Sequence, residues 1–322
     1  MQAGDIKRVA VIGAGIMGEG IAQNFAQADL DVRLVDQNED ILNRCLHQIE
    51  VNLGQFLEYN IIQEKPSEIK KRIRTFISGD LSKAVKDCEY IVEVIPEILQ
   101  LKRDLISQID SLCENAIFAS NTGSLTISLI SEGSLYPGRV IGTHYFNPAH
   151  IMPLVEVHKG KKTLDETLHI TKAFLARTGK MTAVVQKEVP GFIVNRIQGA
   201  MEREIDYLID EGIVTPEDLD IAAKASYGFR LACMGPMEAE DMIGLDTSLR
   251  VSPIIYKALS NSVTPSPSLV KKVEKGELGI KSGVGWYDYR DRPIEQVKAE
   301  INKKLLEQLV VFQNRQPKRV NK

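Results

Sequence analysis

The sequence lacks the features that mark membrane-spanning, secreted and nucleic-acid-coating proteins. No apolar run approaches the roughly 18 residues that a membrane helix requires. The run at residues 9–17 contains glycines and no cleavage-type site follows it, so we expect no signal peptide. The 40 basic and 43 acidic side chains give a net charge of −3, which argues against a nucleic-acid-coating surface. An anionic partner is therefore expected to be small and bound locally.

Cysteine is scarce in this chain. The four cysteines are Cys45, Cys88, Cys113 and Cys233. They are far apart and form no C-x-x-C pair, which excludes a zinc ribbon and a redox dithiol. We expect buried thiols rather than disulfides, and hence a reducing compartment. Because transit-peptide character and a peroxisomal ending are also absent, the expected location is the cytoplasm.

The pattern of apolar residues predicts two domains in the 322 residues. In residues 1–188, short β-branched runs alternate with helical patterns (residues 18–28, 39–63 and 98–112), which is typical of a parallel sheet covered on both faces. The expected strands are residues 8–12, 32–35, 90–94, 116–119, 140–143, 154–157 and 183–185. We therefore predict an α/β fold with a Rossmann-type doubly wound sheet, followed by an all-α C-terminal domain at residues 189–322.

A glycine-rich turn, Gly13-Ala14-Gly15-Ile16-Met17-Gly18, follows the first expected strand. In a strand–turn–helix context, Gly13 permits the tight turn, Gly15 lets the backbone approach a pyrophosphate, and Gly18 allows close helix packing. The free amides at the helix start attract phosphate. We predict that Gly13, Gly15, Ile16, Met17 and Gly18 bind a dinucleotide; a purely structural turn is the alternative.

Asp36, at the end of the second expected strand, discriminates between the two nicotinamide cofactors. Its carboxylate can accept both ribose hydroxyls of NAD. A 2′-phosphate at about 4 Å would be repelled by on the order of 4 kcal/mol at an effective dielectric near 20. We therefore predict NAD rather than NADP; the competing possibility is that Arg33 turns to bind the phosphate.

Three further segments carry side chains suited to catalysis. They are His144-Tyr145-Phe146-Asn147-Pro148, residues 152–157 with Glu156 twelve residues after His144, and Pro190-Gly191-Phe192-Ile193-Val194-Asn195-Arg196. In this order they resemble the L-3-hydroxyacyl-CoA dehydrogenase family, whose pattern is H-x-F-N-P, a glutamate twelve residues on, and P-G-F-x-x-N-R. The resemblance runs nearly end to end, and includes residues 95–97 with Lys102, residues 235–238 and residues 281–287.

The resemblance implies NAD-dependent oxidation of the 3-hydroxyl of an L-3-hydroxyacyl-CoA, expected to be short-chain, as in fatty-acid β-oxidation. It implies that His144 is the acid–base group and that Glu156 orients it and stabilises the imidazolium. Asn195 is expected to hold the substrate oxygen. The positions that the resemblance places around the cofactor are Asn121, at the nicotinamide end, Glu97 and Lys102.

The same residues admit other interpretations. His144, His150, Glu156 and His158 could be imagined as a metal site, but no helical H-E-x-x-H spacing supports it, so we expect no metal. The broader β-hydroxyacid dehydrogenases use a lysine in the interdomain helix, and residues 192–198 contain none. A non-catalytic, crystallin-like structural protein is the alternative from a different class, and the joint presence of His144, Glu156 and Asn195 argues against it.

Two positions depart from the family pattern. Gly123 follows Ser120-Asn121-Thr122 where the acyl-CoA enzymes carry a serine that contacts the substrate, so Thr122 and Ser124 are the candidate substrate-binding hydroxyls. Pro153 stands where those enzymes usually carry lysine. Both departures resemble the related branch that acts on small free hydroxy acids, which includes carnitine, gulonate and pyridine-carboxylate dehydrogenases. The reaction class is predicted, whereas the choice between a CoA thioester and a free acid stays open.

Two features bear on partners. The basic cluster Lys65, Lys70, Lys71, Arg72 and Arg74 could meet the phosphates of CoA, or it could be a solvated helix face balanced by Glu64 and Glu68. The apolar faces of the C-terminal helices favour a homodimer, although they could equally form the core of that domain. The expected partners are thus a small-molecule substrate and a second copy of the chain, with neither nucleic acid nor membrane.

Overall fold

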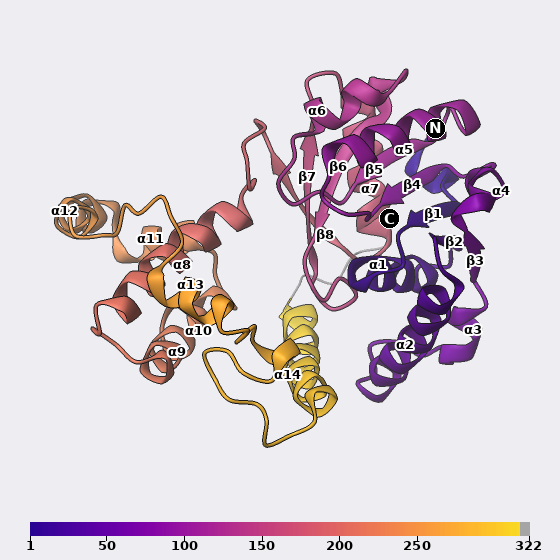
Figure 1. The fold of residues 1–322 in the computed structure, drawn as a ribbon. Helices are drawn as coiled ribbons and strands as arrows, with labels where there is room; N and C mark the ends of the chain where they lie inside the picture. Colours follow the sequence, from indigo (N-terminus) through magenta and orange to yellow (C-terminus); the bar gives the residue numbers. More distant parts are fainter. Residues whose placement is uncertain (316–322) are drawn as a thin grey trace. The chain divides into compact units, whose positions relative to one another are not determined.

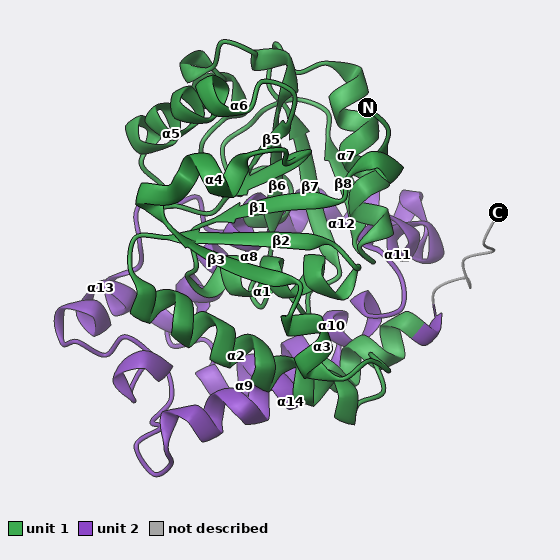
Figure 2. Cartoon of the chain, turned by 90° about the vertical axis from the view of Figure 1, so that its right-hand side faces the viewer, with its two compact units in different colours: residues 1–195, 305–313 green, residues 196–304, 314–322 purple. Residues whose placement is uncertain are grey.

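The computed structural model of the chain describes residues 1–315, which form two compact units (Figure 2). Unit 1 contains Met1–Asn195 together with Leu305–Gln313. Unit 2 contains Arg196–Lys304 and, of the described residues, also Asn314 and Arg315. Each unit has its own architecture: unit 1 is built on a sheet and unit 2 on helices.

Unit 1 is built on an eight-stranded sheet with the order β3-β2-β1-β4-β5-β6-β7-β8 (Figure 1). The strands are β1 (Arg8–Ile12), β2 (Asp31–Asp36), β3 (Ile73–Ile77), β4 (Tyr90–Glu93), β5 (Ile117–Ser120), β6 (Val140–Tyr145), β7 (Leu154–Lys159) and β8 (Met181–Val185). All neighbours pair in parallel except β6 and β7, which are antiparallel. The order reverses between β1 and β4, and the crevice at that reversal is where open α/β sheets bind ligands.

Helices cover both faces of this sheet. They are α1 (Ile16–Gln27), α2 (Glu39–Glu58), α3 (Pro66–Lys70), α4 (Leu81–Val85), α5 (Leu99–Leu112), α6 (Ile127–Ile130) and α7 (Asp165–Arg177). Short 3-10 helices are η1 (Ala3–Asp5), η2 (Ser78–Asp80), η3 (Ser131–Gly133) and η4 (Pro137–Arg139). Because side chains alternate along a strand, β1 sends Val9 and Val11 into a core with α1, α2 and α7, and Ala10 and Ile12 into a core with α4, α5 and α6.

All seven predicted strands are present, with bounds that differ by up to two residues. β3 was missed because it lies at the sheet edge, pairs only with β2, and keeps Arg74 and Thr75 exposed. The sequence also did not predict the reversal between β6 and β7, since a continuous apolar run carries no information about strand direction. This reversal matters because it sets His144 directly opposite Glu156.

A third apolar cluster in unit 1 joins the end of α2 to the C-terminal helix α14 (Ile294–Arg315). Leu306 and Leu309 of α14 are buried against Phe56 and Ile151. Residues 305–313 therefore belong to unit 1, although they follow unit 2 in the chain.

Unit 2 is helical, which confirms the predicted fold class of a Rossmann-type sheet followed by an all-α domain. Its helices are α8 (Val194–Asp210), α9 (Pro216–Ala225), α10 (Tyr227–Leu231), α11 (Pro236–Ile243), α12 (Leu245–Tyr256), α13 (Pro267–Glu274), η5 (Ile280–Ser282) and the first part of α14. Thr215 caps α9, because its hydroxyl accepts the N–H of Asp218 at 3.1 Å. No helix within residues 1–315 is long and apolar enough to cross a membrane.

Candidate active site

The glycine-rich turn lies between β1 and α1, at the carboxyl end of the parallel strands. Gly13 has a φ of 110°, and its N–H donates to the Val35 carbonyl at 2.8 Å, which ties the turn to β2. A Cβ on Gly18 would lie 1.8 Å from the Gly13 carbonyl oxygen, so only glycine lets α1 begin this close to the turn. A Cβ on Gly15 would meet no atom within 4 Å. The backbone there is open, and the amides of Ile16 and Met17 begin α1, which fits a pyrophosphate.

Asp36 is the last residue of β2 and lies beside this turn. Its Oδ2 accepts the Ala14 N–H at 2.7 Å, so the carboxylate is held at the edge of the glycine-rich turn. Arg33 is buried, and its guanidinium donates to the main-chain carbonyls of Lys83, Ala84 and Lys86. Since these bonds hold Arg33 inside unit 1, it is not available to neutralise a 2′-phosphate. The arrangement fits NAD.

The antiparallel register of β6 and β7 pairs His144 with Glu156. The imidazole Nδ1 lies 2.8 Å from Glu156 Oε2, and both side chains are buried. Glu156 Oε1 accepts the N–H groups of Ile193 and Val194, each at 2.9 Å. Burial raises the pKa of Glu156, but the hydrogen bonds from His144, Val194 and Ile193 outweigh it and leave this pKa below its ordinary value. An ionised Glu156 accepts a hydrogen bond from the His144 Nδ1–H group, which leaves His144 Nε2 as a hydrogen-bond acceptor.

His144 Nε2 faces the backbone of Gly123 and the side chain of Asn195. A Cβ on Gly123 would lie 3.3 Å from Nε2 and 3.6 Å from Asn195 Nδ2. Asn195 Nδ2 donates to the Gly123 carbonyl at 3.2 Å. Asn121, just beyond β5, accepts the Tyr145 N–H at 2.8 Å through Oδ1. The structure thus brings His144, Glu156 and Asn195 together around Gly123.

Glu97 holds the loop that contains Gly123. Its Oε1 accepts the hydroxyls of Thr122 and Ser124 and the amides of Gly123 and Ser124. Burial raises the pKa of Glu97, but the hydrogen bonds from Thr122 and Ser124 and the charge of Lys102 outweigh it and lower this pKa to about 2. The two hydroxyls expected to contact substrate therefore donate to Glu97 here.

Lys102 is almost completely buried and its ammonium lies among carboxylates. Its Nζ donates to both oxygens of Glu93, at 2.8 and 2.9 Å, and lies 3.3 Å from Glu97 Oε2. Glu93, at the end of β4, was not singled out from the sequence, although a glutamate closing an apolar strand was the available signal. Lys102 thus supports Glu97 and the loop at residues 122–125.

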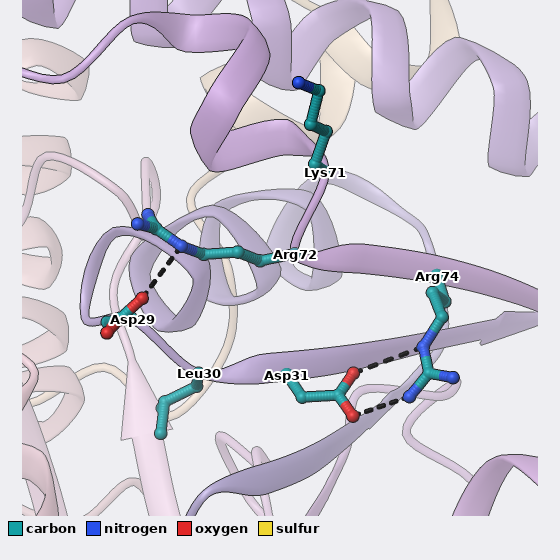
Figure 3. Close-up of a pocket in the computed structure, with 6 residues that line it drawn as sticks. All are labelled: Asp29, Leu30, Asp31, Lys71, Arg72 and Arg74. Atoms are coloured by element: carbon teal, nitrogen blue, oxygen red, sulfur yellow. Dashed lines mark hydrogen bonds and ion pairs between the residues drawn. The ribbon is translucent and has the colours of Figure 1, made fainter.

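The basic cluster lies at the opposite, amino end of β2, where a surface pocket of about 350 Å³ is lined by Asp29, Leu30, Asp31, Lys71, Arg72 and Arg74 (Figure 3). The cations in and beside it have acidic partners: Arg74 with Asp31, Arg72 with Asp29 and Glu64, Lys71 with Glu68, and Lys70 with Glu50. This pairing favours the balanced helix face over a phosphate site. Within residues 1–315, no three His, Cys, Asp or Glu side chains are placed to hold a metal ion.

A dinucleotide-type sheet with a histidine–carboxylate pair at its carboxyl edge defines a nicotinamide-dependent oxidoreductase. Residues 8–189 match the 3-hydroxyacyl-CoA dehydrogenase NAD binding domain, and residues 191–289 match the C-terminal domain of the same family. The chain belongs to the 3-hydroxyacyl-CoA dehydrogenase family, and its cofactor is NAD.

Relatives within this family carry two kinds of name. The chain is 37% identical to a 3-hydroxybutyryl-CoA dehydrogenase of Bradyrhizobium diazoefficiens (88% of this chain, 96% of the relative). It is 33% identical to a 5-formyl-3-hydroxy-2-methylpyridine 4-carboxylate 5-dehydrogenase of Mesorhizobium japonicum (94% and 96%). A crystal structure of an enzyme with the latter activity, described as an NAD⁺-dependent dismutase, superposes with a TM-score of 0.89 at 31% identity (97% of this chain, 100% of that one). The (S)-3-hydroxybutyryl-CoA dehydrogenase of Ralstonia eutropha gives 0.72 at 33% identity (88% and 99%).

Proposed function

We propose that the chain oxidises a secondary hydroxyl group of a 3-hydroxy acid or its thioester, with His144 as the acid–base residue. The observation that carries this proposal is the bond between His144 Nδ1 and Glu156, which leaves Nε2 facing Gly123 and Asn195. Nε2 accepts the hydroxyl proton, Glu156 stabilises the resulting imidazolium, and Asn195 holds the substrate oxygen. Bound NAD supplies the hydride acceptor.

The first candidate substrate is a short-chain L-3-hydroxyacyl-CoA, which is converted to the 3-ketoacyl-CoA. Its support is the family itself, together with relatives named 3-hydroxybutyryl-CoA dehydrogenase at 37–38% identity over 88% or more of this chain. Thr122 and Ser124 stay the candidate substrate-binding hydroxyls under this candidate, and substrate would have to bind them while both donate to Glu97. Under this candidate the enzyme acts in fatty-acid breakdown.

The second candidate is a small free hydroxy acid, and a specific observation favours it. Without a side chain at Gly123, space is open beside His144 Nε2 that a serine would reduce. Four of the five cations of the basic cluster are paired with acidic side chains, which weakens their attraction for the phosphates of CoA. The pyridine-carboxylate enzyme, whose fold is similar over 97% of this chain, is named for a compact ring acid.

Replacing His144 with glutamine tests the chemistry. We expect NAD reduction to fall by about 10²–10⁴-fold, while the enhancement of NADH fluorescence on binding is unchanged, because His144 is not among the residues of the glycine-rich turn. Unchanged turnover would remove His144 from the mechanism. Loss of NADH binding would instead show that the substitution had disturbed the fold.

A substrate panel then separates the two candidates. Initial rates of NAD reduction are compared for (S)-3-hydroxybutyryl-CoA, free 3-hydroxybutyrate, carnitine and gulonate. Turnover of the thioester alone supports the first candidate, and turnover of free acids alone supports the second. The variant G123S is the matched probe, because its added side chain would lie beside His144 Nε2 and should change the turnover of the free acids and of the thioester by different factors.

We further infer a homodimer in a reducing, cytoplasmic setting. Within the described part of unit 2, only Ala239 and Val297 are buried hydrophobic residues, whereas Phe229, Leu249 and Ile254 are more than 70% exposed. Such a helical unit gains by burying these side chains against a second copy. Light scattering of the wild type and of the variant L249D tests the dimer, and a monomeric wild type would contradict it.

A further inference from the structure

His158 lies on β7, the strand that carries Glu156, and faces β6, the strand that carries His144. It follows Glu156 by two residues on β7, so both side chains lie on one face of the strand. Its ring stacks on Phe192, with centroids 3.8 Å apart and an angle of 29° between the planes. Gly142, opposite His158 on β6, makes room for this ring, because a Cβ there would lie 2.0 Å from His158 Cε1.

The ring of His158 is held by packing rather than by hydrogen bonds. The side chain is fully buried, and neither ring nitrogen has a hydrogen-bond partner among the described residues. Burial and the neighbouring His144 lower its pKa to about 3, against a smaller opposing effect of Glu156, so the ring is neutral near pH 7. A buried neutral imidazole without hydrogen bonds costs free energy, and the contact it makes is the stack on Phe192.

Phe192 in turn determines where two amides point. Its φ is 51°, directly after Gly191 at 77°, and this left-handed turn is closed by the Phe192 N–H donating to Val189 O at 3.1 Å. A left-handed conformation is unfavourable for a residue with a Cβ, so neighbouring contacts must maintain it. The turn directs the next two N–H groups, of Ile193 and Val194, onto Glu156 Oε1.

We propose that His158 is a positioning residue for the catalytic pair, which it acts on through Phe192. Its ring keeps Phe192 in the left-handed turn, the turn keeps the Ile193 and Val194 amides on Glu156, and Glu156 thereby keeps the proton on His144 Nδ1. The inference rests on the proposed function for its kinetic consequence, but the structural link can be measured without turnover.

The test compares H158A with H158F and uses His150 as the matched control. His150 is also a buried histidine whose ring lies near a phenylalanine, Phe56, at 5.8 Å, but it does not contact Glu156. We expect H158A to lower kcat at least tenfold with little change in KM for NAD, and to move the acidic limb of the pH–rate profile. H158F keeps an aromatic ring and should restore kcat to within about threefold, and H150A should leave both readouts near wild type.

A second readout separates this proposal from the proposed function. In protein labelled with ¹⁵N-histidine, the His144 resonances report which nitrogen carries the proton, whether or not the substrate is known. We expect Nδ1–H in the wild type and in H158F, and a mixture of tautomers in H158A. An unchanged His144 tautomer in H158A would overturn the positioning role. Absence of dehydrogenase activity in the wild type, with the tautomer shift present, would instead count against the proposed function alone.

Discussion

The substitution E156Q has a predictable effect because Glu156 is bonded on both sides. Oε1 accepts two backbone N–H groups, and Oε2 is hydrogen-bonded to His144 Nδ1. In the glutamine side chain, only the carbonyl oxygen can accept the backbone N–H groups of Ile193 and Val194. The side-chain NH₂ group must therefore face His144 Nδ1. Nδ1 then becomes an acceptor and the proton moves to Nε2, where it blocks removal of the substrate proton. The variant keeps its shape and its hydrogen bonds but has the wrong tautomer.

The magnitude follows from the comparable substitution in a serine protease triad, where the wrong tautomer costs about 10⁴ in kcat. This corresponds to about 5.5 kcal/mol at the transition state, at 1.36 kcal/mol per factor of ten. Stopped-flow absorbance at 340 nm measures the rate, NADH fluorescence measures cofactor binding, and thermal unfolding confirms the fold. E89Q, at the amino edge of the sheet beside Arg8, is the control. A loss of less than tenfold in folded E156Q would refute the assigned tautomer.

Three further predictions concern the cofactor, the loop and acid stability. D36N keeps an acceptor for the Ala14 N–H but removes the charge, so the preference for NAD over NADP should fall by up to about 10³-fold; an unchanged ratio of kcat/KM values would contradict this. E97Q weakens the charged hydrogen bonds to the loop at residues 122–125 and should lower kcat/KM about 5- to 150-fold. If Glu97 only positions this loop, kcat/KM should fall by the same factor for substrate oxidation and for product reduction. Full activity of E97Q would exclude the positioning role of Glu97. His150 has a pKa lowered to about 4 mainly by burial, so between pH 6.5 and 4 the unfolded state binds a proton that the native state does not. Stability should fall across that window, by about 3 kcal/mol at pH 4.5 for this residue, and urea titrations of H150F should show a flatter pH dependence than the wild type.

Much of the candidate site follows from motif order. The Gly13–Gly18 turn and Asp36 are predicted from their strand–turn–helix context, and His144, Glu156 and Asn195 are predicted from the resemblance of their segments to the family pattern. The supporting roles of Glu93, His158 and Phe192 do not follow from the sequence, because they depend on which neighbours these side chains meet in space.

The sequence by itself determined the α/β class, the buried strands and the dinucleotide turn, since these rest on local hydrophobic periodicity and on glycines that must adopt special backbone geometry. Only the tertiary structure decided that β7 runs against β6, that four of the five cations of the basic cluster pair with acidic side chains, and that Glu97 and Lys102 hold a loop. Those outcomes depend on contacts between residues distant in the chain, and a linear pattern of residue types does not encode which charged side chains will pair.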